Sequence, residues 1–219
     1  MTSAPEDPAD RPTTTPGTHV FGVLGGIASG KSAAAAELAG PTGRVASADR
    51  AAHEALQHPE IVARIVARHG RDVLDADGLV DRAALAARVF EDQDARKELE
   101  GWIHPRVREM LFAAFEAAVR DGVPRLVLDV PLLMENAAQH GLLELCDTLV
   151  FVDAPIEERD RRAVRDRGWD PGEVARRERA QLSLDAKRER ADFILPNDQG
   201  HAELTLAVQE LLDALGLSD

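Results

Sequence analysis

An apolar run followed by a glycine-bearing loop constrains this chain more than any other feature. Val20 to Leu24 has the composition of a buried strand, and the next residues, 25–32 (GGIASGKS), match the pattern GxxxxGK[ST]. The alanine-rich stretch from Ala33 to Leu38 then predicts a helix. A strand, a glycine-bearing turn and a helix in this order predict a phosphate-binding loop in an α/β fold.

The residue types in this loop suit the terminal phosphates of ATP. Glycines allow backbone N–H groups to turn inward around phosphate oxygens. We expect Lys31 to reach the terminal phosphates as a cation and the Ser32 hydroxyl to hold Mg²⁺. A chance match in an ordinary turn is the alternative, which the flanking strand and helix disfavour. The predicted ATP-binding residues of the loop and helix start are Gly25, Gly26, Ile27, Ala28, Ser29, Gly30, Lys31, Ser32 and Ala33.

Composition limits the partners that the chain can bind. A formal net charge of −13 argues against a nucleic-acid backbone as partner. No apolar run has the length needed to cross a bilayer, so we expect no membrane segment. Residues 1–18 are rich in proline, threonine and acid, lack a secretory signal and predict a disordered tail. The lone Cys146 lies in an apolar stretch, where we expect a buried thiol rather than a nucleophile, and it fits a reducing cytoplasm.

Apolar runs recur along the chain and predict a parallel α/β sheet. They lie at 20–24, 44–46, 126–129, 148–152 and 193–195, with helical patterns between them. The interval between the second and third runs far exceeds a usual connection. We therefore expect an inserted helical subdomain at about 59–122, which leaves 19–58 and 123–219 as the core of one domain.

Two carboxylates follow predicted strands, at the sheet edge where open α/β proteins bind ligands. Asp49 could accept a proton from an attacking hydroxyl. Alternatively, it could be the N-cap of a helix running from Ala51 to Leu56. Asp129 resembles the carboxylate that holds Mg²⁺ in phosphoryl-transfer enzymes, and its alternative role is to begin a turn before Pro131.

Two further parts of the sequence contain candidate functional residues, an arginine cluster and a histidine that precedes a proline. Arginines cluster between Arg159 and Arg190, where they could form a solvated helix face or neutralise a transferred phosphoryl group. Within this cluster, 167–172 (RGWDPG) predicts a break between two helices, either a mobile lid or an ordinary turn. His104 precedes Pro105 and is expected at the start of a helix, as a surface or capping residue.

In this order and spacing, the motifs resemble those of the dephospho-CoA kinases over most of the chain. The elements that distinguish this family from other small phosphate-loop kinases are His104-Pro105 and 131–135 (PLLME). The remaining matches are GGIASGKS, Asp49, His69-Gly70, Asp77-Gly78, Arg82, Leu85, Phe90, Leu99-Glu100, the arginine-rich segment, Gln181, Ala191-Asp192 and Asn197. The resemblance implies an α/β P-loop NTPase three-layer fold with a parallel sheet of about five strands, a helical substrate-binding insertion and a lid at about 162–190.

The same resemblance implies a reaction and roles for single residues. Transfer of the γ-phosphoryl group of ATP, with Mg²⁺, to the 3′-hydroxyl of dephospho-CoA would give coenzyme A in the cytoplasm. Asp49 would activate that hydroxyl, while Arg82 and His104 would help to bind dephospho-CoA. The partners would be these small molecules, and the protein would be a monomer or weak homo-oligomer. Arginines of the lid would close over the phosphates. Arg165 and Arg167 would be catalytic together with Lys31, and Arg162 is a further candidate. Asn197 would lie near the adenine.

The sequence differs from the family pattern at three positions, and two other functions are alternatives. Ala28 stands where glycine is usual, Ala33 where threonine is common, and Arg159 where glutamine is common. A nucleoside or nucleotide kinase would share the loop and lid without needing His104-Pro105. A GTPase-like switch would need an Asn-Lys-x-Asp motif, which the chain lacks. Trp169 could pack the lid or stack on a ligand.

Overall fold

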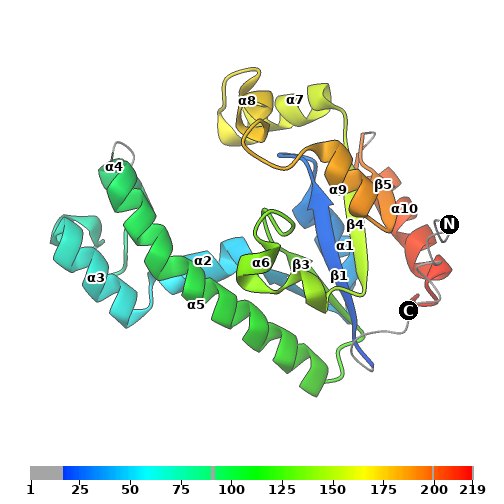
Figure 1. Cartoon of the computed structure of the whole chain (residues 1–219), viewed down its shortest axis with the longest axis horizontal. Coiled ribbons are helices and arrows are strands. Elements are labelled where there is room, and N and C mark those ends of the chain that lie inside the picture. The colour runs from blue at the N-terminus through cyan, green and yellow to red at the C-terminus, as the bar shows by residue number, and fades with distance from the viewer. Residues whose placement is uncertain (1–16, 90–91, 199, 219) are drawn as a thin grey trace. The chain divides into compact units, whose positions relative to one another are not determined.

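The computed structural model describes residues 17–89, 92–198 and 200–218 (Figure 1). The chain divides into two compact units. We call Ser47–Ala114 the helical unit and the remainder, Met1–Ala46 with Phe115–Asp219, the sheet unit. The predicted tail lies outside the described residues except for Gly17 and Thr18, and Phe90 also lies outside them.

A sheet of five strands in the order β2-β3-β1-β4-β5 organises the sheet unit. Its strands are β1 (His19–Gly25), β2 (Arg44–Ser47), β3 (Arg125–Asp129), β4 (Thr148–Asp153) and β5 (Phe193–Pro196). β1 pairs in parallel with both β3 and β4, and β4 pairs in parallel with β5. Figure 1 shows β1 in blue beside the yellow-green β4. The predicted α/β class and parallel sheet are confirmed.

Two helices pack with the sheet to form its core. α1 (Lys31–Ala39) follows β1, and α10 (His201–Ala214) follows β5. Small side chains on α1, among them Ala34 and Ala35, are fully buried against apolar residues of the central strands and of α10. The alanine run therefore brings α1 close to the sheet, and this fixes the phosphate-binding loop that joins β1 to α1.

Further helices lie in the C-terminal half of the sheet unit. They are α6 (Ala137–His140), the 3₁₀ turn η3 (Leu143–Leu145), α7 (Ile156–Arg167), α8 (Glu173–Glu178) and α9 (Leu184–Arg190). The predicted break at 167–172 lies between α7 and α8, with left-handed glycines at Gly168 (φ 63°) and Gly172 (φ 84°). The Asp160 carboxylate accepts a hydrogen bond from Gly172 N at 2.9 Å, which ties the start of α8 to α7.

The helical unit has a core of its own. It contains α2 (Ala48–Leu56), α3 (Pro59–His69), the 3₁₀ turn η2 (Arg71–Val73), α4 (Arg82–Val89) and the first part of α5 (Gln93–Arg120), which continues into the sheet unit. Ile65 and Val73 are fully buried in this core, and Trp102 of α5 packs against it. No helix in the described parts of the chain is long and apolar enough to cross a membrane.

The structure decides against one alternative and corrects one predicted helix start. α2 begins at Ala48, and its N-cap is Ser47, whose hydroxyl accepts from Arg50 N, so Asp49 lies in the first turn instead of at the cap. α5 begins at Gln93, so His104 and Pro105 lie inside the helix. A proline removes one backbone hydrogen bond there, but Trp102 and Val107 on either side pack against the core of the helical unit. Burial of these neighbours favours a continuous helix.

Candidate functional site

The backbone of the loop between β1 and α1 turns back on itself at left-handed residues. Gly30 has φ 94° and is the N-cap of α1. Ala28, which is not a glycine, has φ 59°. A Cβ atom added to Gly30 would lie 2.1 Å from Asn197 Nδ2, so only glycine fits where the loop meets Asn197. The sequence predicted the need for glycine at position 30, and its contact with Asn197 was not predicted.

Lys31 folds back over this loop. Its Nζ donates to Gly26 O at 2.7 Å and to Gly25 O at 3.3 Å. Burial lowers the pKa of Lys31 to about 8, and the nearby Asp129 carboxylate partly opposes this shift. The ammonium group is therefore held at the loop by neutral carbonyl groups, with its charge poorly solvated and available to an anion.

Ser32 and Asp129 meet beside Lys31. Ser32 Oγ donates to Asp129 Oδ2 at 2.7 Å, and Asp129 is buried at the end of β3. A hydroxyl and a carboxylate are the hard oxygen ligands that Mg²⁺ prefers, and this ion usually completes its shell with phosphates and water. Within the described residues, no three His, Cys, Asp or Glu side chains gather into a metal site. The donor set fits a magnesium ion held jointly with a nucleotide.

Of the three lid arginines considered from the sequence, Arg162 lies at the loop. Its Nη1 donates to Ser29 O at 3.3 Å, its Nη2 donates to Asn197 O at 2.9 Å, and its Nε pairs with Glu158 at 2.8 Å. Asn197 Nδ2 also donates to Ser29 O, at 2.7 Å. One backbone carbonyl of the loop thus binds both a guanidinium from α7 and an amide that follows β5.

The other two lid arginines have different surroundings. Arg165 is exposed and pairs with its neighbour Asp166 at 2.6 Å. Arg167 lies with its guanidinium carbon 5.0 Å from the centroid of the Trp169 ring, and it contributes to the lowered pKa of Lys31. Arg177 of α8 lies closer to the same ring, at 4.0 Å. Trp169 therefore contacts two arginines, one from α7 and one from α8.

Sequence reasoning missed an ion pair that contacts the loop. Glu178 of α8 accepts a hydrogen bond from Ile27 N at 2.7 Å and pairs with Arg159 of α7 at 2.5 Å. Arg159 is almost fully buried, and its Nη1 also donates to Ile27 O at 3.3 Å. The only available signal was the arginine at position 159 itself, and nothing in the sequence indicated that Glu178 is its partner.

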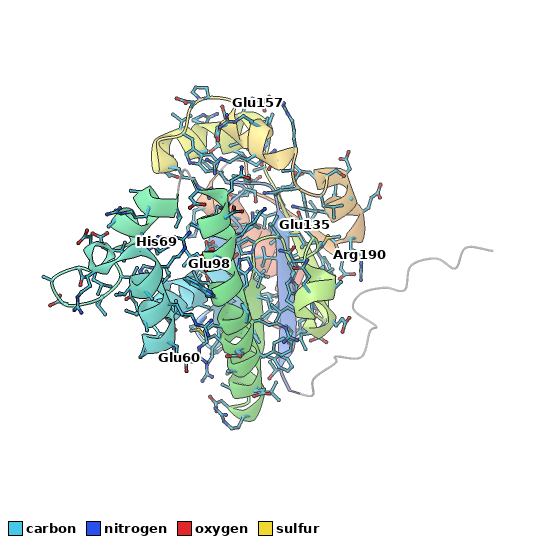
Figure 2. The ribbon with its side chains drawn as sticks, turned by 60° about the vertical axis from the view of Figure 1, so that its left-hand side comes forward. Glu60, His69, Glu98, Glu135, Glu157 and Arg190 are labelled. Carbon is cyan, nitrogen blue, oxygen red and sulfur yellow. The ribbon has the colours of Figure 1, made fainter. Side chains whose placement is uncertain are left out.

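A second buried pair involves the Pro-Leu-Leu-Met-Glu motif. Lys187 of α9 is buried and pairs with Glu135, labelled in Figure 2, at 2.7 Å. Glu135 also accepts from Leu182 N at 3.2 Å. Lys187 is close enough to Lys31 to lower its pKa. The motif therefore supplies the carboxylate that holds Lys187, and with it α9, near the loop. The sequence of the motif alone did not reveal this role.

The substrate-binding candidates lie in the helical unit. Asp49 is exposed in the first turn of α2, and His53 follows one turn later on the same side of the helix. Arg82, the first residue of α4, has its Nη1 3.3 Å from His53 Nδ1. His53 therefore brings Arg82 to the α2 surface that carries Asp49, which the sequence did not predict. His104 is exposed on α5.

Comparison with known proteins identifies the family of this chain. A family profile described as dephospho-CoA kinase matches residues 19–203. A dephospho-CoA kinase from Corynebacterium diphtheriae is 37% identical over 194 residues, which are 88% of this chain and 95% of that protein. One from Symbiobacterium thermophilum is 39% identical over 194 residues, 88% of this chain and 79% of that protein.

A solved structure from Thermus thermophilus extends the comparison to three dimensions. It has a TM-score of 0.69 to this chain at 32% sequence identity and covers 92% of this chain and 99% of its own. The profile match covers most of the chain, and the identities extend over nearly whole proteins. The chain belongs to the dephospho-CoA kinase family.

Proposed function

We propose that this protein transfers the γ-phosphoryl group of ATP to the 3′-hydroxyl of dephospho-CoA and so forms coenzyme A. The observation that carries the proposal is a phosphate-binding loop with a half-buried cation, Lys31, on a chain that matches the family over residues 19–203. In the reaction, the 3′-oxygen forms a bond to the γ-phosphorus, the bond to the leaving ADP breaks, and the hydroxyl proton is transferred to a base.

Residues of the sheet unit bind the nucleotide in this proposal. The loop from Gly25 to Ala33 surrounds the phosphates with backbone N–H groups, and Lys31 places its charge on the terminal ones. Ser32 and Asp129 would hold Mg²⁺, which when bound neutralises phosphate charge. Arg162 already contacts the loop, whereas Arg165 and Arg167 would have to leave Asp166 and Trp169 to reach the transferred group. Asn197 lies beside the loop and would border the adenine.

Residues of the helical unit bind and activate the acceptor. Asp49 takes the 3′-hydroxyl proton as general base, a role open to it because Ser47 provides the N-cap of α2. Arg82 and His104 bind dephospho-CoA, whose phosphates a guanidinium suits. Assignment of about 59–122 as the substrate-binding insertion and of about 162–190 as a lid is part of the same proposal. Closure of the lid would exclude water from the transferred phosphoryl group.

The location and assembly of the protein are also proposed. A cytoplasmic site of action is supported by the need for ATP and by the single cysteine. Burial raises the pKa of the half-buried Cys146 thiol to about 12, so the thiol remains protonated at neutral pH. We expect a monomer or weak homo-oligomer, which light scattering after size-exclusion chromatography would test.

A panel of acceptors tests the proposed reaction. The purified protein is incubated with ATP and magnesium together with dephospho-CoA, adenosine, AMP or shikimate, and the products are followed by mass spectrometry. We expect ADP and coenzyme A to form with dephospho-CoA alone. Turnover confined to adenosine or AMP would overturn the substrate assignment in favour of a nucleoside or nucleotide kinase and would leave the ATP site unchanged.

A further inference from the structure

The phosphate-binding loop contains a residue in an unfavourable backbone conformation. Ala28 has φ 59°, and apart from Leu132 it is the only non-glycine residue with positive φ among residues 17–89, 92–198 and 200–218. The Cβ atom of an L-residue is too close to the backbone in this left-handed region, which glycine occupies freely. An isolated loop would therefore tend to move Ala28 to negative φ, and something must oppose that change.

Both backbone groups of the preceding residue are bound by one ion pair. Glu178 accepts from Ile27 N at 2.7 Å, and Arg159 Nη1 donates to Ile27 O at 3.3 Å. Arg159 and Glu178 are joined at 2.5 Å, with side-chain exposures of only 5% and 15%. Because the two groups on either side of Ile27 Cα are both fixed, the peptide that enters Ala28 has little freedom to rotate.

The ion pair is itself anchored and packed. Arg159 Nε donates to Ala154 O at 3.0 Å, directly after β4, which pairs with β1. A Cβ atom added to Gly26 would lie 2.5 Å from Arg159 Nη1 and 2.7 Å from Glu178 Oε1. The pair therefore lies directly against the Gly26–Ile27 backbone, and the sheet holds its arginine in place.

We propose that the Arg159–Glu178 pair is a clamp that holds Ile27 and thereby keeps Ala28 in the left-handed conformation of the ATP-binding loop. Both are positioning residues that act through Ile27. The proposal rests on the ATP site of the proposed function and deepens it.

The test compares the clamp in two loop backgrounds. Arg159→Met combined with Glu178→Leu removes both contacts without leaving a buried charge unpaired, a replacement that folded proteins often tolerate. We expect the double variant to bind ATP about fivefold more weakly. An alanine in the left-handed conformation costs about 1 kcal/mol, which corresponds to a factor of about five in an equilibrium constant. The affinity of the Ala28→Gly variant alone is the reference for the second background. In the triple variant, glycine adopts positive φ without the clamp, so most of the lost affinity should return.

Affinity is measured by calorimetric titration of ATP with magnesium chloride and without any acceptor. The result is therefore independent of the dephospho-CoA assignment, which the acceptor panel tests separately. Arg161→Gln is the matched control, since Arg161 is an exposed arginine of the same helix that pairs with Glu158. We expect its affinity for ATP to equal that of the unaltered protein.

Two results would overturn the clamp. Equal loss of affinity with and without the Ala28→Gly substitution would mean that the pair acts elsewhere than on the loop conformation. Tighter binding by the double variant would mean that the Glu178 carboxylate competes with phosphate for Ile27 N. If thermal melting shows that the double variant does not fold, Glu178→Gln provides the same comparison, with a smaller loss that should also disappear in the Ala28→Gly background.

Discussion

Lys31 has to be charged to bind phosphate, yet the fold removes water from its ammonium group. Its Nζ is bound by the carbonyls of Gly25 and Gly26, and burial lowers its pKa to about 8, from an ordinary value of about 10.4. An ammonium in this state gains more from an arriving anion than a hydrated one does. The pattern GxxxxGK[ST] predicted the lysine, but its shifted pKa depends on burial that no local motif encodes.

This shift gives ATP binding a pH dependence. In the free protein Lys31 is a cation below about pH 8 and becomes neutral above it, so binding at higher pH must first take up a proton. We expect the affinity for ATP to be steady near pH 7 and to fall above pH 8 by up to about tenfold per pH unit. Calorimetry across this range measures it.

Lys31→Arg is the matched control, because a guanidinium remains charged over the whole range. Any affinity that this variant retains should be independent of pH between about 7 and 9.5. A flat profile for the unaltered protein would show that Lys31 keeps its proton throughout, contrary to the expectation.

Asp49 gives the second prediction at this scale. Asp49→Asn should lower kcat with dephospho-CoA by about 10²- to 10⁴-fold, as expected for loss of a general base. The affinity for ATP and the melting temperature should change little, because Ser47 and not Asp49 caps α2. Steady-state kinetics and thermal melting provide these measurements. Unchanged turnover would remove Asp49 from the chemistry.

At the scale of helices and strands, apolar runs predicted the five strands, most clearly β1, β3 and β4, because a buried parallel strand is mostly apolar along its length. Helix starts were harder. Ser47 and Asp49 are both good N-cap residues two positions apart, and local chemistry does not decide between them. The partnership of Arg159 with Glu178 was not predictable either, since it joins two helices through long-range packing.

The turn between α7 and α8 yields a prediction about the lid. Trp169 contacts both Arg167 and Arg177, and removing the ring takes one contact away from each guanidinium group. Trp169→Leu should raise the KM for ATP about two- to fivefold, which corresponds to the ~0.5–1 kcal/mol of an exposed cation–π contact. Initial-rate kinetics measure this change, and kcat should remain within about twofold.

Trp169→Phe distinguishes the electrostatic contact from simple filling of space. Phenylalanine retains a ring face, although a weaker one, so this variant should fall between the unaltered protein and Trp169→Leu. Equal effects of leucine and phenylalanine would mean that the two arginines do not depend on an aromatic ring.

On the scale of the whole molecule, the chain forms two units that differ in the size of their cores. The long interval between the second and third strands predicted a helical insertion, whereas the compact helical unit is Ser47–Ala114. Its core is smaller than the one around β1 and α1. The boundary could not be read from the sequence because α5 runs through it without a break.

The difference in cores predicts an order of opening. A unit with less buried apolar surface opens at a lower free energy. We expect backbone amides of α3 to exchange with deuterium earlier than those of β1 and β4, under conditions where the sheet remains protected. Hydrogen exchange followed by mass spectrometry measures this. Simultaneous exchange of all three elements would show that the units open together.

The two tryptophans are divided between the units, Trp102 on α5 in the helical unit and Trp169 beside the lid arginines in the sheet unit. The chain has no tyrosine, so indole rings dominate its near-ultraviolet emission. Replacing either ring by phenylalanine leaves an emitter in one unit alone. Trp102 then reports the apolar core of the helical unit, and Trp169 reports its arginine neighbours. Two spectra from one chain therefore separate the melting of that core from changes around the turn between α7 and α8.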